Sequence, residues 1–280
     1  MKKIMIILMC VLPVYLAAAF EQDLAMFFNL KEGKRAGLTG APYLAYSSDS
    51  GAGAGLQIIL FDACLDSIKI DPFELQWDAS FTTEGERKLE LDYTKEFTHQ
   101  KWSLLAHLEY KKKPSDFWGI GADTPENQKE TYTQIQNIGK LQMKKTITAS
   151  LSAGPVLQFY RYDFVEKEDS LQLVTGLIKG SEDHFSLTGL GLVWDLNRTD
   201  VKNYPGQGYR IIHENIFYSS VQGGNYHFYV SNLDLRAYTR VFGNHILCAQ
   251  LLSQNTSDNP PFQMMPKQGG SSIMRGFSNG

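Results

Sequence analysis

Apolar and polar residues alternate with a period of two through most of this 280-residue chain. In the clearest run the apolar positions are Phe73, Leu75, Trp77, Ala79 and Phe81, and every position between them is polar. Because successive side chains of a β-strand point to opposite faces, this pattern predicts strands with one apolar and one polar face. No segment sustains the 3.6-residue period of an amphipathic helix, so the predicted fold class is all-β.

The alternating runs predict about eleven strands, and most of them are long. They lie near 41–48, 52–63, 70–83, 86–98, 101–112, 131–144, 146–161, 183–196, 207–219, 226–241 and 244–255. Strands of soluble sheets average ~5–6 residues, whereas a tilted strand needs ~9–11 residues to cross a bilayer. The lengths therefore favour an antiparallel transmembrane β-barrel. A soluble secreted β-sandwich, which shows the same alternation in shorter strands, is the alternative.

The links between these runs also differ in length. Links that follow even-numbered strands are mostly short, at 98–100, 144–145 and 242–244, and the long ones follow odd-numbered strands, at 113–130, 162–182 and from 256 onward. Membrane barrels have short periplasmic turns and longer outer loops, so this segregation fits a barrel. Three links depart from the rule: 47–51 and 83–85 are short, and 197–206 is long for a periplasmic turn.

The N-terminus has the order of a secretory signal. Two lysines follow Met1, residues 4–16 are apolar, and three alanines at 17–19 supply small residues for cleavage. The apolar run contains Pro13 and is shorter than the ~20 residues that a membrane helix needs. We therefore predict a signal peptide at 1–19, a periplasmic lead-in at 20–40 and an outer-membrane β-barrel at 41–280.

Composition excludes several other classes of protein. With 27 Lys+Arg against 30 Asp+Glu the formal charge is −3, which argues against nucleic-acid binding by a basic surface. The mean hydropathy of −0.26 excludes a bundle of membrane helices but is ordinary for a barrel. The six histidines show no metal-ligand spacing, and no catalytic motif is present, so we expect no enzymatic activity, metal or cofactor. The state of Cys64 and Cys248 stays open.

A stretch after the last predicted strand contains Arg275, Gly276 and Phe277. It resembles the (V/M)-R-G-F/Y signature of the outer-membrane barrel-assembly superfamily, which includes BamA, TamA, two-partner secretion transporters and the bacterial surface antigen family. In that superfamily the motif lies in a loop between strands eleven and twelve of a sixteen-stranded barrel, and here it follows the eleventh predicted strand. An arginine brought into a barrel interior needs an acidic partner, since an unpaired desolvated charge is costly. The resemblance implies that this acid comes from strands after the loop.

A second likeness involves Asp195 and Arg198, followed by Pro205 and Gly208. These residues look like the acidic/arginine element and the P-x-x-G turn between strands eight and nine of the same superfamily. Weaker likenesses occur at 42–46, 51–55 and 117–125, so the resemblance covers roughly residues 40–280.

The resemblance implies a non-enzymatic barrel that acts in outer-membrane protein assembly, in translocation or as a passive pore. Assembly members carry POTRA domains ahead of the barrel, and residues 20–40 are too few for one. The sequence reaches only into the motif loop, so we expect an incomplete barrel. The expected partners are outer-membrane lipid, the barrel-assembly machinery during insertion, and periplasmic or surface proteins. The barrel half of a secretion system with a separate passenger is a further alternative.

Overall fold

The computed structural model describes residues 36–47, 50–62, 72–97, 99, 101–120, 129–167, 173, 178–201, 204–243, 245–257 and 260–266. Residues 1–35, with the predicted signal peptide, and residues 267–280, with Arg275, Gly276 and Phe277, lie outside this part. The strands are β1 (Ala36–Ser47), β2 (Gly51–Asp62), β3 (Phe73–Thr82), β4 (Arg87–Phe97), β5 (Trp102–Phe117), β6 (Glu130–Thr146), β7 (Leu151–Lys167), β8 (His184–Thr199), β9 (Gly208–Gln222), β10 (His227–Arg240) and β11 (Ile246–Thr256). A 3-10 turn, η2 (Phe262–Met264), follows β11.

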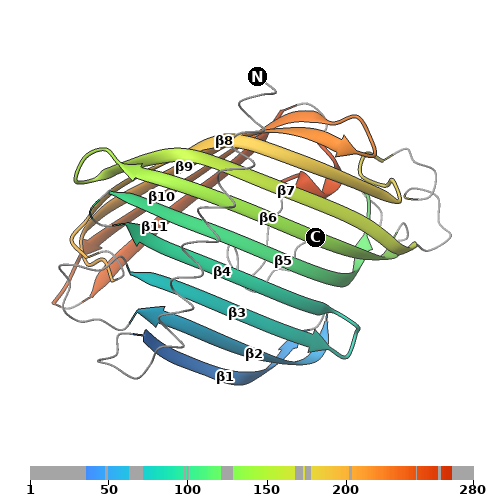
Figure 1. Cartoon of the computed structure of the whole chain (residues 1–280), viewed down its shortest axis with the longest axis horizontal. Coiled ribbons are helices and arrows are strands. Elements are labelled where there is room, and N and C mark those ends of the chain that lie inside the picture. The colour runs from blue at the N-terminus through green and yellow to red at the C-terminus, as the bar shows by residue number, and fades with distance from the viewer. Residues whose placement is uncertain are drawn as a thin grey trace.

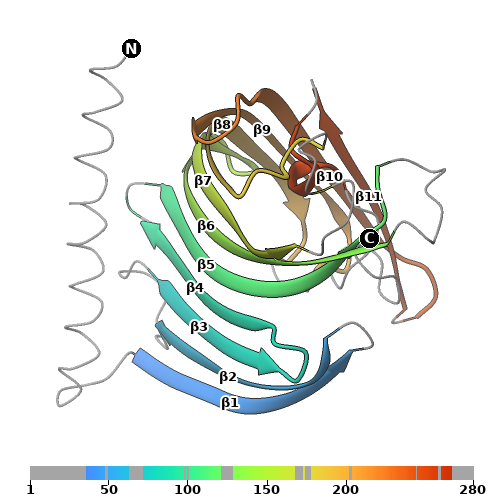
Figure 2. The ribbon, with the colours of Figure 1, turned by 90° about the vertical axis from the view of Figure 1, so that its right-hand side faces the viewer.

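All eleven strands form one antiparallel sheet in sequence order, each paired with its chain neighbours. The sheet curls into an open trough, with η2 on its concave side (Figures 1 and 2). Among the described residues it does not close, because β1 pairs only with β2 and β11 only with β10. The predicted all-β antiparallel architecture is confirmed. No helix in the described part of the chain is long and apolar enough to cross a membrane.

Two strands extend well beyond their predicted ends. β5 runs to Phe117 rather than to 112, since its ladder with β6 continues through Pro114 opposite Thr133 and Phe117 opposite Glu130. β7 runs to Lys167 rather than to 161. The long links predicted at 113–130 and 162–182 therefore begin too early, because pairing with the neighbouring strand overrides the weak strand preference of residues such as Pro114.

The two faces of the sheet differ in chemistry. Large apolar side chains are exposed on the convex face, among them Trp77, Leu108, Phe159, Leu190 and Phe217. The alternate positions point to the concave side and carry most of the charged residues of β3–β10. This is the segregation that the period-two pattern predicts.

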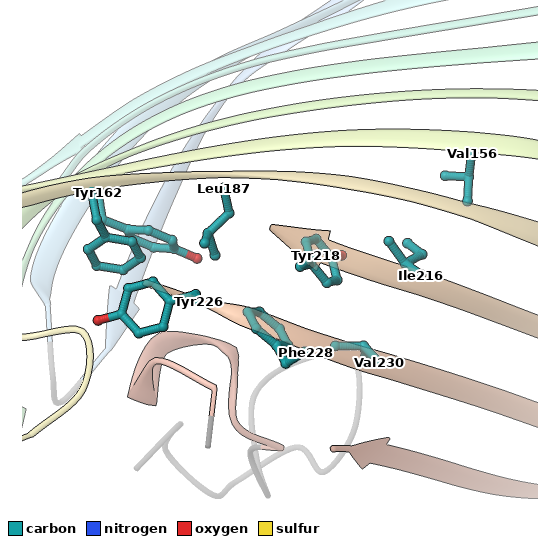
Figure 3. Close-up of a cluster of buried hydrophobic side chains, with 9 residues drawn as sticks. Val156, Tyr162, Leu187, Ile216, Tyr218, Tyr226, Phe228 and Val230 are labelled. Carbon is teal, nitrogen blue, oxygen red and sulfur yellow. The ribbon is translucent and has the colours of Figure 1, made fainter. Parts of the chain in front are cut away.

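Aromatic clusters occupy part of the concave side. The larger one comes from β7–β10 and contains Val156, Tyr162, Phe185, Leu187, Ile216, Tyr218, Tyr226, Phe228 and Val230. Figure 3 shows these side chains below the arch of the strands, beside the chain segment that carries η2. A second cluster joins Phe262 of η2 to Phe117, Tyr132 and Leu173. The end of the sheet nearest the long loops is therefore packed, not open.

Candidate functional site

Asp195 of β8 is the centre of an ion cluster on the concave face. It is 6% exposed. Arg210 of β9 donates from Nε to Oδ1 at 2.9 Å and from Nη2 to Oδ2 at 2.7 Å, and Lys144 Nζ of β6 donates to Oδ2 at 3.0 Å. A bidentate arginine together with a lysine is the kind of compensation that a buried carboxylate requires.

The glycine at position 154 in β7 allows β6 to approach closely beside this cluster. A Cβ atom there would lie 1.9 Å from the carbonyl oxygen of Met143 and 3.0 Å from Cα of Lys144. No larger residue fits without moving the backbone of β6. Gly154 thus helps to set the position from which Lys144 reaches Asp195.

Two more ion pairs continue along the same face. Lys140 Nζ of β6 donates to Glu214 Oε2 of β9 at 2.5 Å. In β10, Arg236 Nη2 donates to Asp234 Oδ2 at 2.6 Å. We call these pairs and the Asp195 cluster the concave ion-pair wall, made of Lys140, Lys144, Asp195, Arg210, Glu214, Asp234 and Arg236. Each of its three carboxylates is paired with at least one of its four basic side chains, which suits a polar interior wall with fixed geometry.

The remaining residues of the predicted turn motif lie away from this wall. Arg198 is three residues from Asp195 in the same strand, so it points to the opposite face, and it is exposed. Gly208 begins β9 with a φ of 113°, and a Cβ there would lie 2.1 Å from the carbonyl oxygen of Arg198. Pro205 lies in the turn between β8 and β9. The structure therefore brings Asp195 to Lys144 and Arg210, two partners that the sequence analysis missed, and separates it from Arg198.

Asp200 organises that turn and was not among the predicted site residues. Its Oδ1 accepts hydrogen bonds from the backbone N–H groups of Val201 at 2.9 Å, Gly206 at 2.9 Å and Gln207 at 3.1 Å. These bonds, the one from Gln207 foremost, hold the pKa of the Asp200 carboxyl below its ordinary value despite some desolvation. An aspartate just after a strand and six residues before a glycine is the sequence signal that could have identified it.

A group of potential metal ligands lies elsewhere on the concave face. Glu90 and Asp92 of β4 and His107 of β5 place one ligand atom each within 4.8 Å of one another. His107 Nδ1 is 2.8 Å from Asp92 Oδ1, and its Nε2 is 3.9 Å from Glu109 Oε2. Imidazole and carboxylate ligands together suit a divalent transition metal. The spacing of these residues in the sequence did not reveal this group. Strand pairing brings it together, because Asp92 lies opposite His107 and Glu90 lies opposite Glu109.

The segment after β11 packs into the concave side. The Phe262 ring lies 5.1 Å from that of Phe117 and 6.0 Å from that of Tyr132, between centroids. Gln263 Nε2 donates to the Gly180 carbonyl at 2.8 Å, and Tyr162 donates its hydroxyl hydrogen to Met264 Sδ at 3.5 Å. Residues 260–266 thus link the β7–β8 connection to the concave face of the sheet at its long-loop end.

Comparison with known proteins identifies the family. A model of the Omp85 superfamily domain matches residues 74–280, which is most of the chain. The chain belongs to the Omp85 superfamily. The resemblance to the barrel-assembly superfamily inferred from the motifs is therefore confirmed. No curated protein matches the sequence.

A solved Omp85 structure gives the same architecture. The crystal structure of BamA from Haemophilus ducreyi lacking POTRA domains 1–3 is similar to this chain with a TM-score of 0.55 and 16% identity. The match covers 89% of this chain and 47% of that one, so the chain spans about half the length of its solved relative. At this identity the shared property is the fold.

Proposed function

We propose that this chain forms the wall of a bacterial outer-membrane β-barrel that takes part in the assembly or translocation of other polypeptides, without enzymatic activity. The observation that carries the proposal is the division of the sheet into an apolar convex face and an ion-paired concave face. Strands of 10 to 17 residues are long enough to cross a bilayer at a tilt. Apolar side chains then face lipid, and the concave ion-pair wall faces water.

The packed segment 260–266 favours a translocation or assembly role over a constantly open channel. Phe262, Gln263 and Met264 each contact a different part of the concave side or of the β7–β8 link. In a closed barrel this segment would lie at the long-loop end of the interior, so we infer that passage there requires it to move. A barrel that handles polypeptides intermittently suits such a closure.

A passive pore is the second candidate, and the polar concave wall favours it. Matched ion pairs such as Lys140–Glu214 line the face that would contact the solution. Such a lining is typical of water-filled barrels. The two candidates differ in whether ions pass steadily.

Fractionation and conductance test the proposal. Expressed with its own N-terminus in a Gram-negative host, the protein should fractionate with the outer membrane and migrate faster on gels when unboiled. In planar bilayers the folded protein should give rare, brief openings. Steady open-channel current would favour the pore. A soluble periplasmic protein without heat-modifiable migration would reject the membrane assignment altogether.

A further inference from the structure

The convex face carries an unexpected group of polar residues on β9, β10 and β11. Its members are His213, Asn215, Tyr229, Ser231, Ser253 and Asn255, and we call them the convex polar patch. Register places Asn215, Ser231 and Asn255 side by side in one row, and in the next row His213 and Ser253 lie on either side of Leu233. They occupy the face that elsewhere carries exposed leucine and phenylalanine.

The patch lies between two apolar rows on the same face. On one side, Leu196, Ile211 and Leu235 are paired across β8, β9 and β10. On the other side, Leu190 is paired with Phe217, and both are 55% exposed. On β9 and β10, His213, Asn215 and Ser231 therefore lie inside the apolar band, while Tyr229 belongs to the row of Phe217 and Ser253 and Asn255 are the last two convex positions of β11.

Hydrogen bonds connect the patch through a neutral His213. Trp194 Nε1 donates to His213 Nδ1 at 3.1 Å, and Asn215 Nδ2 lies 3.2 Å from the same nitrogen. Because Nδ1 accepts, the ring proton is on Nε2, which donates to Ser231 Oγ at 2.9 Å. Tyr229 donates its hydroxyl hydrogen to Asn215 Oδ1. The histidine, asparagine and tyrosine are thus fixed as one rigid unit.

The unit retains hydrogen-bonding capacity toward the outside. The Ser231 hydroxyl, the second N–H of Asn215 and the Asn255 amide can each donate further, and serine and asparagine oxygens can accept further. Acyl chains offer neither donors nor acceptors, so lipid contact leaves this capacity unused. Described positions on the convex side of β8–β11 between the two apolar rows carry no Asp, Glu, Lys or Arg.

We propose that the convex polar patch is the contact surface between two copies of this chain in the membrane. The proposal rests on the proposed membrane function, because it requires the convex face to lie in a bilayer. Serine and asparagine both donate and accept, so the patch is complementary to itself after a two-fold rotation. Since it carries no charge, two copies do not repel each other. Leu190, Leu192 and Phe217 then extend the contact with apolar surface beside the polar residues.

Disulfide crosslinking in native outer membranes tests the contact. In a background with Cys64→Ser and Cys248→Ser, the variant Ser231→Cys should form a disulfide-linked dimer on mild oxidation. Leu108→Cys is the matched control: it lies on the convex face of β5, is 57% exposed and is four strands away from β9. We expect dimer from Ser231→Cys and only background from Leu108→Cys. Equal yields from the two variants, or crosslinks to other polypeptides only, overturn the proposal.

Copurification of two differently tagged copies in mild detergent gives a second readout. The double variant Asn215→Leu, Ser231→Ala should weaken copurification about tenfold, since hydrogen bonds between membrane-embedded surfaces contribute modestly each. Heat-modifiable migration of the same variant shows whether it folds. If the protein is absent from the outer membrane, the proposed function fails. If it is present there but its copies do not associate, only the dimer inference fails.

Discussion

Arg210 donates two hydrogen bonds, of 2.9 and 2.7 Å, to the carboxylate of Asp195 on the neighbouring strand of the concave face. The geometry fixes the end of β8 against β9, close to the turn that joins them. Lys144 supplies a second cation from β6, so three strands meet at one carboxylate. The pairing of the strands brings these three side chains together, and their ion pairs in turn stabilise that pairing.

Replacing Asp195 with asparagine should destabilise the folded protein by about 3 kcal/mol. Breaking one side of a buried ion pair leaves its partners uncompensated, at a cost on the order of 3–5 kcal/mol, and contact with solution on the concave side places this pair at the low end. Urea unfolding in detergent, followed by loss of heat-modifiable migration, measures the change. Asp163→Asn is the control, since its pair with Arg161 is more exposed and surface ion pairs contribute little to stability. Equal effects from the two variants would contradict the special role of Asp195.

Substituting alanine at Gly154 should also destabilise the barrel wall. The new Cβ would lie 1.9 Å from a backbone oxygen of β6, so the strands must separate, at a cost of about 1–3 kcal/mol. Gly139→Ala provides the comparison on the adjacent strand, because its Cβ would meet nothing closer than 3.7 Å. Thermal unfolding should show a clear loss for the first variant and little change for the second. A similar melting temperature for both variants would mean that the backbone of β6 can shift to accommodate the new Cβ without loss of stability.

The sequence predicted the strands far better than the site, and the reason is physical. Alternation at Phe73, Leu75 and Trp77 depends only on neighbours along one strand, so it can be read directly. The grouping of Asp195, Lys144 and Arg210 depends on register across three other strand pairings, which no local pattern encodes. The same holds for Glu90, Asp92 and His107.

The ends of strands were missed for a related reason. Pro114 and its lysine neighbours have weak strand preference, yet the long partner strand β6 extends the ladder past them. Asp200 directly follows β8, and no local pattern assigns it a role. Its function in the turn depends on three backbone N–H groups converging on one oxygen, which only the folded loop displays.

Removing the Phe262 ring should weaken the packing of residues 260–266 against the concave side of the sheet. Phe262→Ala deletes ring contacts to Phe117, Tyr132 and Phe164, so residues 260–266 should leave the interior more often. We expect more frequent openings in planar bilayers and faster proteolysis of the segment. Phe242→Ala is the control, because that ring is 81% exposed in the β10–β11 turn. Unchanged conductance and proteolysis in the Phe262 variant would mean that this ring does not hold the closure.

The turn held by Asp200 should loosen in acid. Its carboxyl has a folded-state pKa below the value of about 3.9 for an unperturbed aspartate, because the ionised form accepts three backbone hydrogen bonds. A carboxyl whose pKa is lower in the folded state than in the unfolded state stabilises the fold at pH values above its unfolded-state pKa. This stabilisation is lost as the pH falls through its folded-state pKa. Hydrogen exchange at Gly206 and Gln207, corrected for intrinsic rates, should therefore accelerate below about pH 4. Asp200→Asn should exchange faster at neutral pH and lose most of this pH dependence, because an amide does not ionise. If the variant kept the same acid transition, another group would control the turn.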